Sequence, residues 1–322
     1  MTQHETNPYR YSIANKRYMT FDYYMKHRFG GKIAKIPLDA GFTCPNIADG
    51  SGGCIYCMNG SSGATGASGA ADGTIAEQYE RGKARITDKW QPDGFIPYLQ
   101  AHTNTFAPPS VLREVYEKAA SLDGAVMLAI ATRADCLSDA VIDELVGVSR
   151  KIPLLVELGL QTTDDRTARL INRGHSFAEF VNGYTRLRQA GGDIAVCVHL
   201  IAGLPGEDND TVMNTARETA ALAPDMVKIH LLHVMRGTRL GEMYECGEYT
   251  PMTEEEYVAA VCSMIEVMPE NCVIARLTGD GQAKDLLAPM WSIKKMHVMN
   301  EIDKEFVRRG TYEGIYADGK RR

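Results

Sequence analysis

The amino-acid sequence predicts an α/β fold built around a parallel sheet. Short apolar segments of strand character alternate with amphipathic segments of 10–15 residues, as in consecutive β-α-β units. The segment 125–131 is apolar throughout, which is typical of a strand buried on both faces. Two capping boxes, Ser176-x-x-Glu179 and Thr253-x-x-Glu256, indicate where two of the helices begin.

The pattern gives six strands, which we place at 32–38, 95–101, 125–131, 154–159, 193–201 and 226–232. Helices are expected at 74–90, 109–121, 137–148, 176–191, 208–223, 253–268 and 284–310. Six strands are fewer than the eight that close a full barrel, so an open doubly wound sheet and a partial barrel both fit. In either fold, functional side chains gather at the carboxyl-terminal ends of the strands.

Composition places the chain among ordinary globular proteins. It has 322 residues, of which 24% are charged and 44% hydrophobic, enough for one large domain with a sizeable core. No apolar run approaches the roughly 18 residues that span a membrane, and the first residues lack an apolar signal core. We therefore expect a cytoplasmic protein with reduced thiols and no membrane partner. The net charge of −6 argues against broad contact with a nucleic-acid backbone.

Three cysteines follow the first predicted strand in a glycine-rich loop. Cys44, Cys54 and Cys57 have the spacing Cys-x9-Cys-x2-Cys. Thiols this close in a chain without signs of secretion are more often metal ligands than disulfide partners. Structural zinc and most electron-transfer clusters take four protein ligands, so three leave one coordination position open for a small molecule. The alternative is a zinc site of three cysteines and one histidine, His27 or His102.

Polar side chains also follow the later strands. A run of them, 100–105, comes after the second strand, and Arg133 with Asp135 after the third. Glu157 lies within the fourth strand, where a carboxylate among apolar neighbours needs a basic partner. Each of these groups has a plainer structural explanation, as a loop hydrogen bond or an ion pair. The other five cysteines lack metal-site spacing, and we expect them to be inert buried thiols: Cys136, Cys197, Cys246, Cys262 and Cys272.

The cysteine loop resembles the cluster loop of radical S-adenosylmethionine (SAM) enzymes, and its long first gap resembles their elongator-type branch. From about residue 18 to the end, the chain is similar to one bacterial family, the YhcC-type proteins. The tracts that carry this likeness are PLDAGFTCPN, GGCIYC, YLQAHTNTFAP, VELGLQT, INRGH, VHLIAGLPGE and LLHVMRGTRL. The resemblance implies a partial (β/α)6 TIM-like barrel with N- and C-terminal extensions.

The expected domains follow from the same resemblance. Residues 1–31 would form an N-terminal extension whose aromatic residues pack on the core, although their interleaved basic residues also fit an RNA-stacking surface. Residues 32–270 would form the radical SAM core. Residues 271–322 would form a C-terminal extension with a helix and a basic tail, Lys320–Arg321–Arg322. The Gly- and Ser-rich stretch 59–73 is expected to be a flexible connector.

The resemblance implies that Cys44, Cys54 and Cys57 hold a 4Fe-4S cluster. SAM would bind the fourth iron through its amino and carboxylate groups. An external one-electron donor such as flavodoxin or ferredoxin would then drive cleavage to a 5′-deoxyadenosyl radical, which acts on an unidentified substrate. Two alternatives stay open: a tRNA-modifying enzyme of the same class, and a non-catalytic scaffold protein that binds a cluster or zinc.

The resemblance also implies which residues contact SAM. Tyr56 would lie against adenine, with Gly203 beside it, and His199 occupies the position of a ribose-contacting acid. Gln161 and Arg173 resemble the polar pair that holds SAM in coproporphyrinogen dehydrogenase. The run after the second strand departs from the usual Gly-Gly-Glu-like motif for the amino group, for which we favour Gln100, Thr103 and Asn104. Candidate catalytic residues close the sixth strand, and with His102 they indicate a polar substrate: His230, His233 and Arg236.

Overall fold

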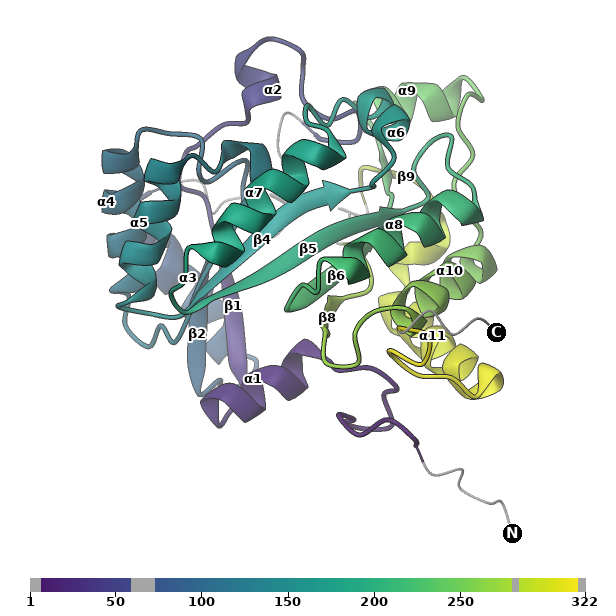
Figure 1. The fold of residues 1–322 in the computed structure, drawn as a ribbon, viewed down its shortest axis with the longest axis horizontal. Helices are drawn as coiled ribbons and strands as arrows, with labels where there is room; N and C mark the ends of the chain where they lie inside the picture. Colours follow the sequence, from purple (N-terminus) through teal and green to yellow (C-terminus); the bar gives the residue numbers. More distant parts are fainter. Residues whose placement is uncertain (1–6, 59–72, 280–283, 318–322) are drawn as a thin grey trace.

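The computed structural model describes residues 7–58, 73–279 and 284–317. Its centre is a curled sheet of seven parallel strands in the order β1-β2-β3-β4-β5-β6-β8 (Figure 1). The sheet forms a half-barrel, which confirms the predicted α/β fold of the TIM-like partial-barrel type. The strands are β1 (Ile33–Leu38), β2 (Gly94–Leu99), β3 (Leu128–Thr132), β4 (Leu154–Gln161), β5 (Ile194–Ala202), β6 (Met226–Leu231) and β8 (Val273–Arg276).

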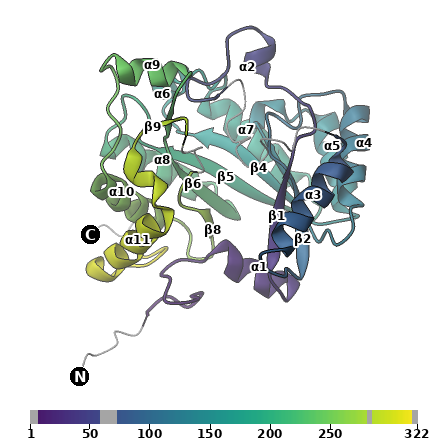
Figure 2. The same ribbon diagram turned by 180° about the vertical axis from the view of Figure 1, so that it is seen from behind.

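Helices pack on the outer face of this sheet, as Figure 1 and the reverse view in Figure 2 show. They include α3 (Ile75–Thr87), α4 (Pro109–Ala120), α5 (Asp139–Ser149), α7 (Phe177–Gln189), α8 (Asn209–Ala221) and α10 (Glu254–Glu266). Their apolar faces and every second residue of the strands form the largest core cluster. Both predicted capping boxes are present, at α7 and α10, and a third opens α3.

The inner face of the half-barrel is closed at one end by the start of the chain. Helix α1 (Phe21–Phe29) directly precedes β1, so it lies at the amino-terminal edge of the sheet (Figure 1). Tyr9, Met19 and Met25 pack there against inward-facing apolar residues of the strands, among them Leu155 and Met226. This apolar plug leaves the opposite, carboxyl-terminal end of the half-barrel for polar groups.

All six predicted strands are present, and the structure adds elements that the sequence pattern missed. The seventh strand, β8, has only four residues and pairs with β6. A separate antiparallel pair joins β7 (Val234–Met235) to β9 (Leu286–Ala288). Short helices occur at α2 (Pro45–Ala48), α6 (Asp165–Leu170) and α9 (Arg239–Glu245), and 3-10 turns at η2 (Ala134–Cys136) and η3 (Met290–Ile293).

The C-terminal helix is shorter than expected. We predicted it over 284–310, but α11 covers Lys295–Arg309 because β9 and η3 occupy the residues before it. The basic tail and the connector 59–72 lie outside the described residues. The division into extensions and core at 31/32 and 270/271 stays a prediction. In the structure, β8 of the C-terminal segment joins the main sheet, and α1 of the N-terminal segment contacts both β1 and β8.

Candidate functional site

A cavity of about 270 Å³ lies at the carboxyl-terminal end of the half-barrel and extends between its strands. Eleven of the fourteen predicted site residues line it: Cys44, Cys54, Tyr56, Cys57, Gln100, Thr103, Gln161, Arg173, His199, His230 and His233. The structure therefore brings together side chains from the cysteine loop and from β2, β4, β5 and β6. Among the described residues, Asn104, Gly203 and Arg236 are the predicted site residues that do not line the cavity.

The cysteine loop lines the side of this cavity that faces away from the strands of the half-barrel. Cys44 precedes α2, and Gly50, Gly52 and Gly53 then take positive φ angles of 79–87° that turn the chain back sharply. Asn172, which follows α6, fixes the returning chain, since its side-chain amide donates to the carbonyl of Gly53 at 2.7 Å. No disulfide joins any of the eight cysteines, all of which lie within the described residues.

Polar groups surround the three thiols. The Thr103 hydroxyl donates to Cys44 Sγ at 3.2 Å, and the Asn46 amide lies 3.7 Å from Cys54 Sγ. A hydrogen bond with Cys57 lowers the pKa of Cys54 to about 6, against the effect of burial, whereas burial raises the pKa of Cys44. Hydrogen bonds to sulfur favour thiolate ligands and tune a cluster that they bind.

The donor set fits an iron–sulfur cluster. Within the described ranges, no three His, Cys, Asp or Glu side chains converge as ligands of a single metal ion. Cysteines that hold a multi-iron cluster each bind a different iron, so their thiols need not converge on one point. Of the two histidines considered for zinc, His27 lies on α1 at the far end of the sheet, and His102 Nδ1 is 3.9 Å from Cys44 Sγ.

Arg133, one of the polar strand-end residues for which an ion pair with Asp135 was the plainer explanation, lies at the cavity. The expected bridge to Asp135 is present and bidentate, with distances of 3.0 and 2.7 Å. Yet Arg133 also lines the cavity, and its Nη1 is buried without a hydrogen-bond partner in the described part of the chain. A buried guanidinium nitrogen without a partner is costly unless a ligand accepts from it.

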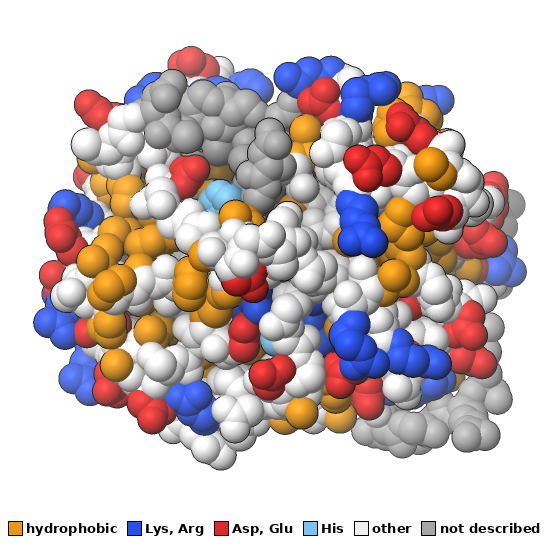
Figure 3. Space-filling model, turned by 90° about the horizontal axis from the view of Figure 1, so that it is seen from above, with side chains coloured by type: hydrophobic (Ala, Val, Ile, Leu, Met, Phe, Trp, Pro, Cys, Tyr) orange, Lys and Arg blue, Asp and Glu red, His pale blue; other side chains and the backbone are white. Residues whose placement is uncertain are grey.

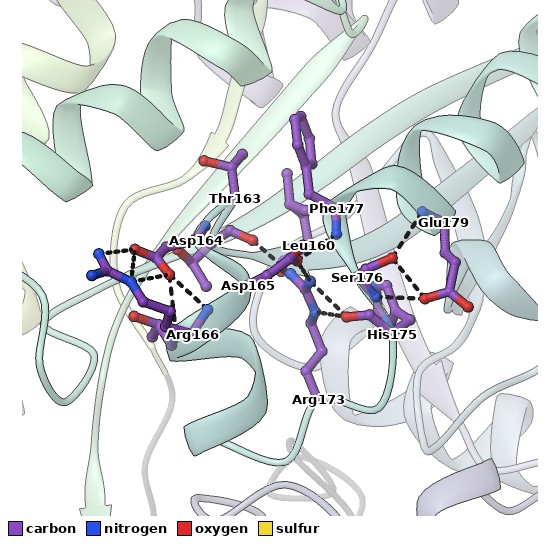
Figure 4. Close-up of polar contacts among 12 residues, drawn as sticks. Leu160, Thr163, Asp164, Asp165, Arg166, Arg173, His175, Ser176, Phe177 and Glu179 are labelled. Atoms are coloured by element: carbon purple, nitrogen blue, oxygen red, sulfur yellow. Dashed lines mark hydrogen bonds and ion pairs between the residues drawn. The ribbon is translucent and has the colours of Figure 1, made fainter.

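Arg173 has the opposite environment. Figure 4 shows its guanidinium enclosed by backbone carbonyls. It donates to Leu160 O and Thr162 O through Nη1 and to His175 O through Nε and Nη2, and only 2% of the residue is exposed. Arg173 therefore joins the end of β4 to the loop before α7.

Two of the residues outside the cavity have clear structural partners. The Asn104 amide donates to the carbonyls of Leu99, Ala101 and Ala131, which holds the turn after β2 against β3. The Gly203 carbonyl accepts from the Tyr249 hydroxyl at 2.6 Å. The third, Arg236, has a side chain that is 66% exposed and lies beside Glu245.

A buried polar network forms the floor of the cavity around Glu157. Its Oε1 accepts from Lys35 at 2.8 Å, and its Oε2 from Tyr98, Lys228 and His199. Burial would raise the pKa of Glu157, but Lys228 and Lys35 together hold it well below its usual value. The basic partner that the sequence required is therefore present, although the sequence did not identify which residues provide it.

The histidines of the floor and wall are neutral at neutral pH. Burial and the charge of Lys228 lower the pKa of His199 to about 4, and burial and Arg276 do the same for His233. The pKa of His230 is also well below its usual value, first through burial and then through His199. These rings can therefore act as neutral hydrogen-bonding groups rather than as cations.

Comparison with known proteins assigns the chain to a family. The model of the radical SAM superfamily matches residues 49–219, and that of the Radical_SAM C-terminal domain matches 224–308. The uncharacterized protein YtqA of Bacillus subtilis is 43% identical over 97% of this chain and 96% of its own length. Protein YhcC of Escherichia coli K12 is 35% identical over 89% of this chain and 91% of its own length.

The chain is more distantly similar to proteins of the elongator branch. The tRNA uridine(34) acetyltransferase of Methanocaldococcus jannaschii is 32% identical over 160 residues, which are 48% of this chain and 28% of that protein. Among solved structures, Elp3 of Methanocaldococcus infernus, with its N-terminus deleted, superposes with a TM-score of 0.66 at 21% identity. That superposition covers 87% of this chain and 64% of the other.

Proposed function

Because this chain belongs to the radical SAM superfamily, and is thus an enzyme with a 4Fe-4S cluster and SAM as cofactors, we propose that the described cavity is its active site. Cys44, Cys54 and Cys57 would hold the cluster. When bound, the reduced cluster supplies the electron that cleaves SAM to a 5′-deoxyadenosyl radical. The substrate on which that radical acts is not identified.

One observation carries this assignment: the three thiols share a cavity with the polar strand-end side chains. A cluster protein that only transfers electrons does not need a polar cavity beside its ligands. Here Gln100, Gln161 and Arg133 line the cavity together with the cysteines. Gln161 adopts a positive φ of 64°, a conformation that a residue other than glycine keeps only where its surroundings impose it.

Arg133 is our candidate for the group that binds the SAM carboxylate. Its buried, unpartnered Nη1 would gain an acceptor there, and a guanidinium suits a carboxylate geometrically. Arg173, which the family resemblance favours for holding SAM, already donates to three backbone carbonyls. We propose that Arg173 shapes the SAM site through β4 while Arg133 contacts the ligand.

The remaining contacts follow the same logic. Gln100 and Gln161 are candidates to contact the amino group and the ribose of SAM, and His199 lines the cavity from β5. Tyr56 lies between two cysteine ligands, lines the cavity and packs against an apolar cluster, so its ring offers a face to adenine. Thr103 donates to Cys44, which gives it a role toward the cluster rather than toward SAM.

Anaerobic reconstitution tests this function. The protein would be loaded with iron and sulfide, reduced and mixed with SAM, and the electron paramagnetic resonance spectrum and 5′-deoxyadenosine would be recorded. We expect a 4Fe-4S signal that shifts when SAM is added, together with 5′-deoxyadenosine formation. Cys57→Ala should abolish both, whereas Cys246→Ala, at an exposed thiol, should preserve both.

The alternatives predict different results. A bound zinc ion, or a cluster whose spectrum ignores SAM, would refute the assignment of the cavity and favour the scaffold interpretation. Equal 5′-deoxyadenosine from the wild type and Cys57→Ala would refute the choice of ligands. Loss of product in Arg133→Met with an unchanged cluster signal would support the proposed carboxylate contact.

An RNA substrate is a second candidate, supported by the similarity to a tRNA uridine(34) acetyltransferase. The visible face in Figure 3 has acidic and basic side chains intermixed around the rim rather than one broad basic patch. RNA binding would then depend on contacts to an unpaired base more than on the phosphate backbone. SAM cleavage stimulated by bulk tRNA, and not by a matched single-stranded DNA, would support this candidate.

The electron donor and the compartment are also proposals. We expect an external one-electron donor such as flavodoxin or ferredoxin. A cytoplasmic location is supported by the lack of disulfides among the eight cysteines, all of which lie within the described residues. Over the described part of the chain, no helix has the length and apolar character needed to cross a bilayer. Replacement of flavodoxin by dithionite should preserve 5′-deoxyadenosine formation if the donor only supplies electrons.

A further inference from the structure

The floor of the cavity lies below Gln161, at the strand end where we place SAM, and His199 lies between these two regions. Glu157 precedes Gln161 by four residues on β4, which corresponds to about 13 Å along a strand. His199, Lys228 and Arg276 pair in register across β5, β6 and β8, and they line the cavity two residues nearer the strand ends than Glu157, since His199 pairs with Gly159. The floor is therefore a row of neighbouring side chains from adjacent strands.

Among the described residues, cations outnumber carboxylates at this floor. Glu157 is the only Asp or Glu among the described residues that line the cavity. Lys35, Lys228 and Arg276 contribute three cations around it, and Lys228 is only 4% exposed. Both oxygens of Glu157 already accept hydrogen bonds, Oε1 from Lys35 and Oε2 from Tyr98, Lys228 and His199.

A ring nitrogen beside these cations lacks a hydrogen-bond partner among the described residues. This nitrogen is His230 Nε2, which is buried with no partner over residues 7–58, 73–279 and 284–317, and the His230 ring centre is 5.2 Å from that of His199. The Lys228 ammonium has three N–H donors and contacts Glu157 and Tyr98. In its Nε2–H tautomer, His230 could donate to an anion that also contacts Lys228. A buried unpartnered nitrogen next to a cation is satisfied best by an acceptor with negative charge.

We propose that the floor of the cavity is a subsite for a small oxyanion of the substrate, carboxylate or phosphate, bound by Lys228 and His230 in the field of Arg276. This inference rests on the proposed function, since it places the substrate below SAM in the same cavity. The anionic group anchors the substrate at the floor, and the rest of the molecule extends toward the cysteine loop. Neutral analogues of the substrate should then bind poorly.

Titration calorimetry on the oxidised, SAM-loaded holoenzyme tests the subsite, because bound SAM keeps probes off the open iron. The probes are sodium acetate, inorganic phosphate and acetamide, a neutral analogue of acetate, at constant ionic strength. We expect at least one of the two anions to bind at least tenfold more tightly than acetamide. Preference for acetate would identify a carboxylate group, and preference for phosphate a phosphoryl group.

Variants locate the binding. Lys228→Gln should weaken anion binding at least tenfold, whereas Lys228→Arg, which keeps the charge, should weaken it less than threefold. Lys118→Gln is the matched control, because Lys118 is exposed and pairs only with Glu114 on α4. If Lys228→Gln does not fold, His230→Leu provides the test, and we expect it to weaken anion binding about fivefold or more.

Two results would overturn the subsite: anions that bind no better than acetamide, or equal anion binding by the wild type and both floor variants. Formation of 5′-deoxyadenosine, measured on the same preparation, separates this inference from the proposed function. Cleavage without anion binding would remove the subsite alone. Anion binding that depends on Lys228 without cleavage would support the subsite and refute the proposed function.

Discussion

Replacing Arg173 by methionine distinguishes a structural clamp from a SAM ligand. Methionine preserves an unbranched side chain but removes every N–H donor. The guanidinium donates to three carbonyl oxygens in a site where the residue is 2% exposed. Each carbonyl that loses a buried partner costs about 1 kcal/mol or more, so we expect the free energy of unfolding to fall by about 3 kcal/mol.

Urea unfolding of the cluster-free protein, followed by circular dichroism, measures this loss without SAM. Arg133→Met is the matched comparison, because its guanidinium pairs with Asp135, donates to one backbone carbonyl, that of Gly174, and has one nitrogen with no partner among the described residues. We expect it to change the unfolding free energy by less than about 1 kcal/mol and to weaken SAM binding at least tenfold. If instead Arg173→Met unfolds like the wild type and loses SAM affinity, the clamp interpretation is wrong.

Two further predictions concern the cluster and pH. Thr103→Val removes the hydrogen bond to Cys44 and should lower the midpoint potential of the cluster by about 60 mV, the one-electron equivalent of ~1.4 kcal/mol. The control is Thr105→Val, because the Thr105 hydroxyl pairs with Thr132; it should leave the potential unchanged in the same redox titration. Burial and the charge of Arg173 lower the pKa of His175 to about 4. In the unfolded chain this histidine has a pKa of about 6.5, so its contribution to the free energy of unfolding is fully present above pH 6.5. That free energy falls by about 1.4 kcal/mol per pH unit as the pH is lowered from 6.5 to 4. His175→Phe should remove this contribution in urea titrations at pH 7, 6 and 5, and an unchanged slope would contradict the assignment.

The sequence predicts the sheet well because each element carries its own local signal. Apolar segments mark the six main strands, and capping boxes mark the starts of α7 and α10. β8 was missed because four residues give too short a pattern. The start of α11 was misplaced because η3 and β9 depend on contacts with distant parts of the chain, which no local pattern encodes.

The site could be predicted only in part, for a similar reason. The spacing of the cysteines is local, and the polar residues at strand ends follow from the topology of a parallel sheet. The choice between Arg133 and Arg173 depends on which backbone carbonyls lie nearby, and residue type does not reveal that. Lys35 and Lys228 are 122 and 71 residues from Glu157 along the chain, so their pairing becomes visible only in the fold.

Burying the charged side chains of the floor costs free energy, and apolar side chains at the same positions would stabilise the fold equally well. Directly below it, the half-barrel is filled by Leu155, Met226 and other apolar residues. Burying an ion pair costs several kcal/mol per charge before the partners interact, and replacing such pairs by well-packed apolar residues is often neutral or stabilising. Stability therefore does not explain why Glu157 and Lys228 lie at the base of this cavity. The proposed anionic group of the substrate would use their charge, and under that proposal the floor and the cysteine loop form two ends of one active site.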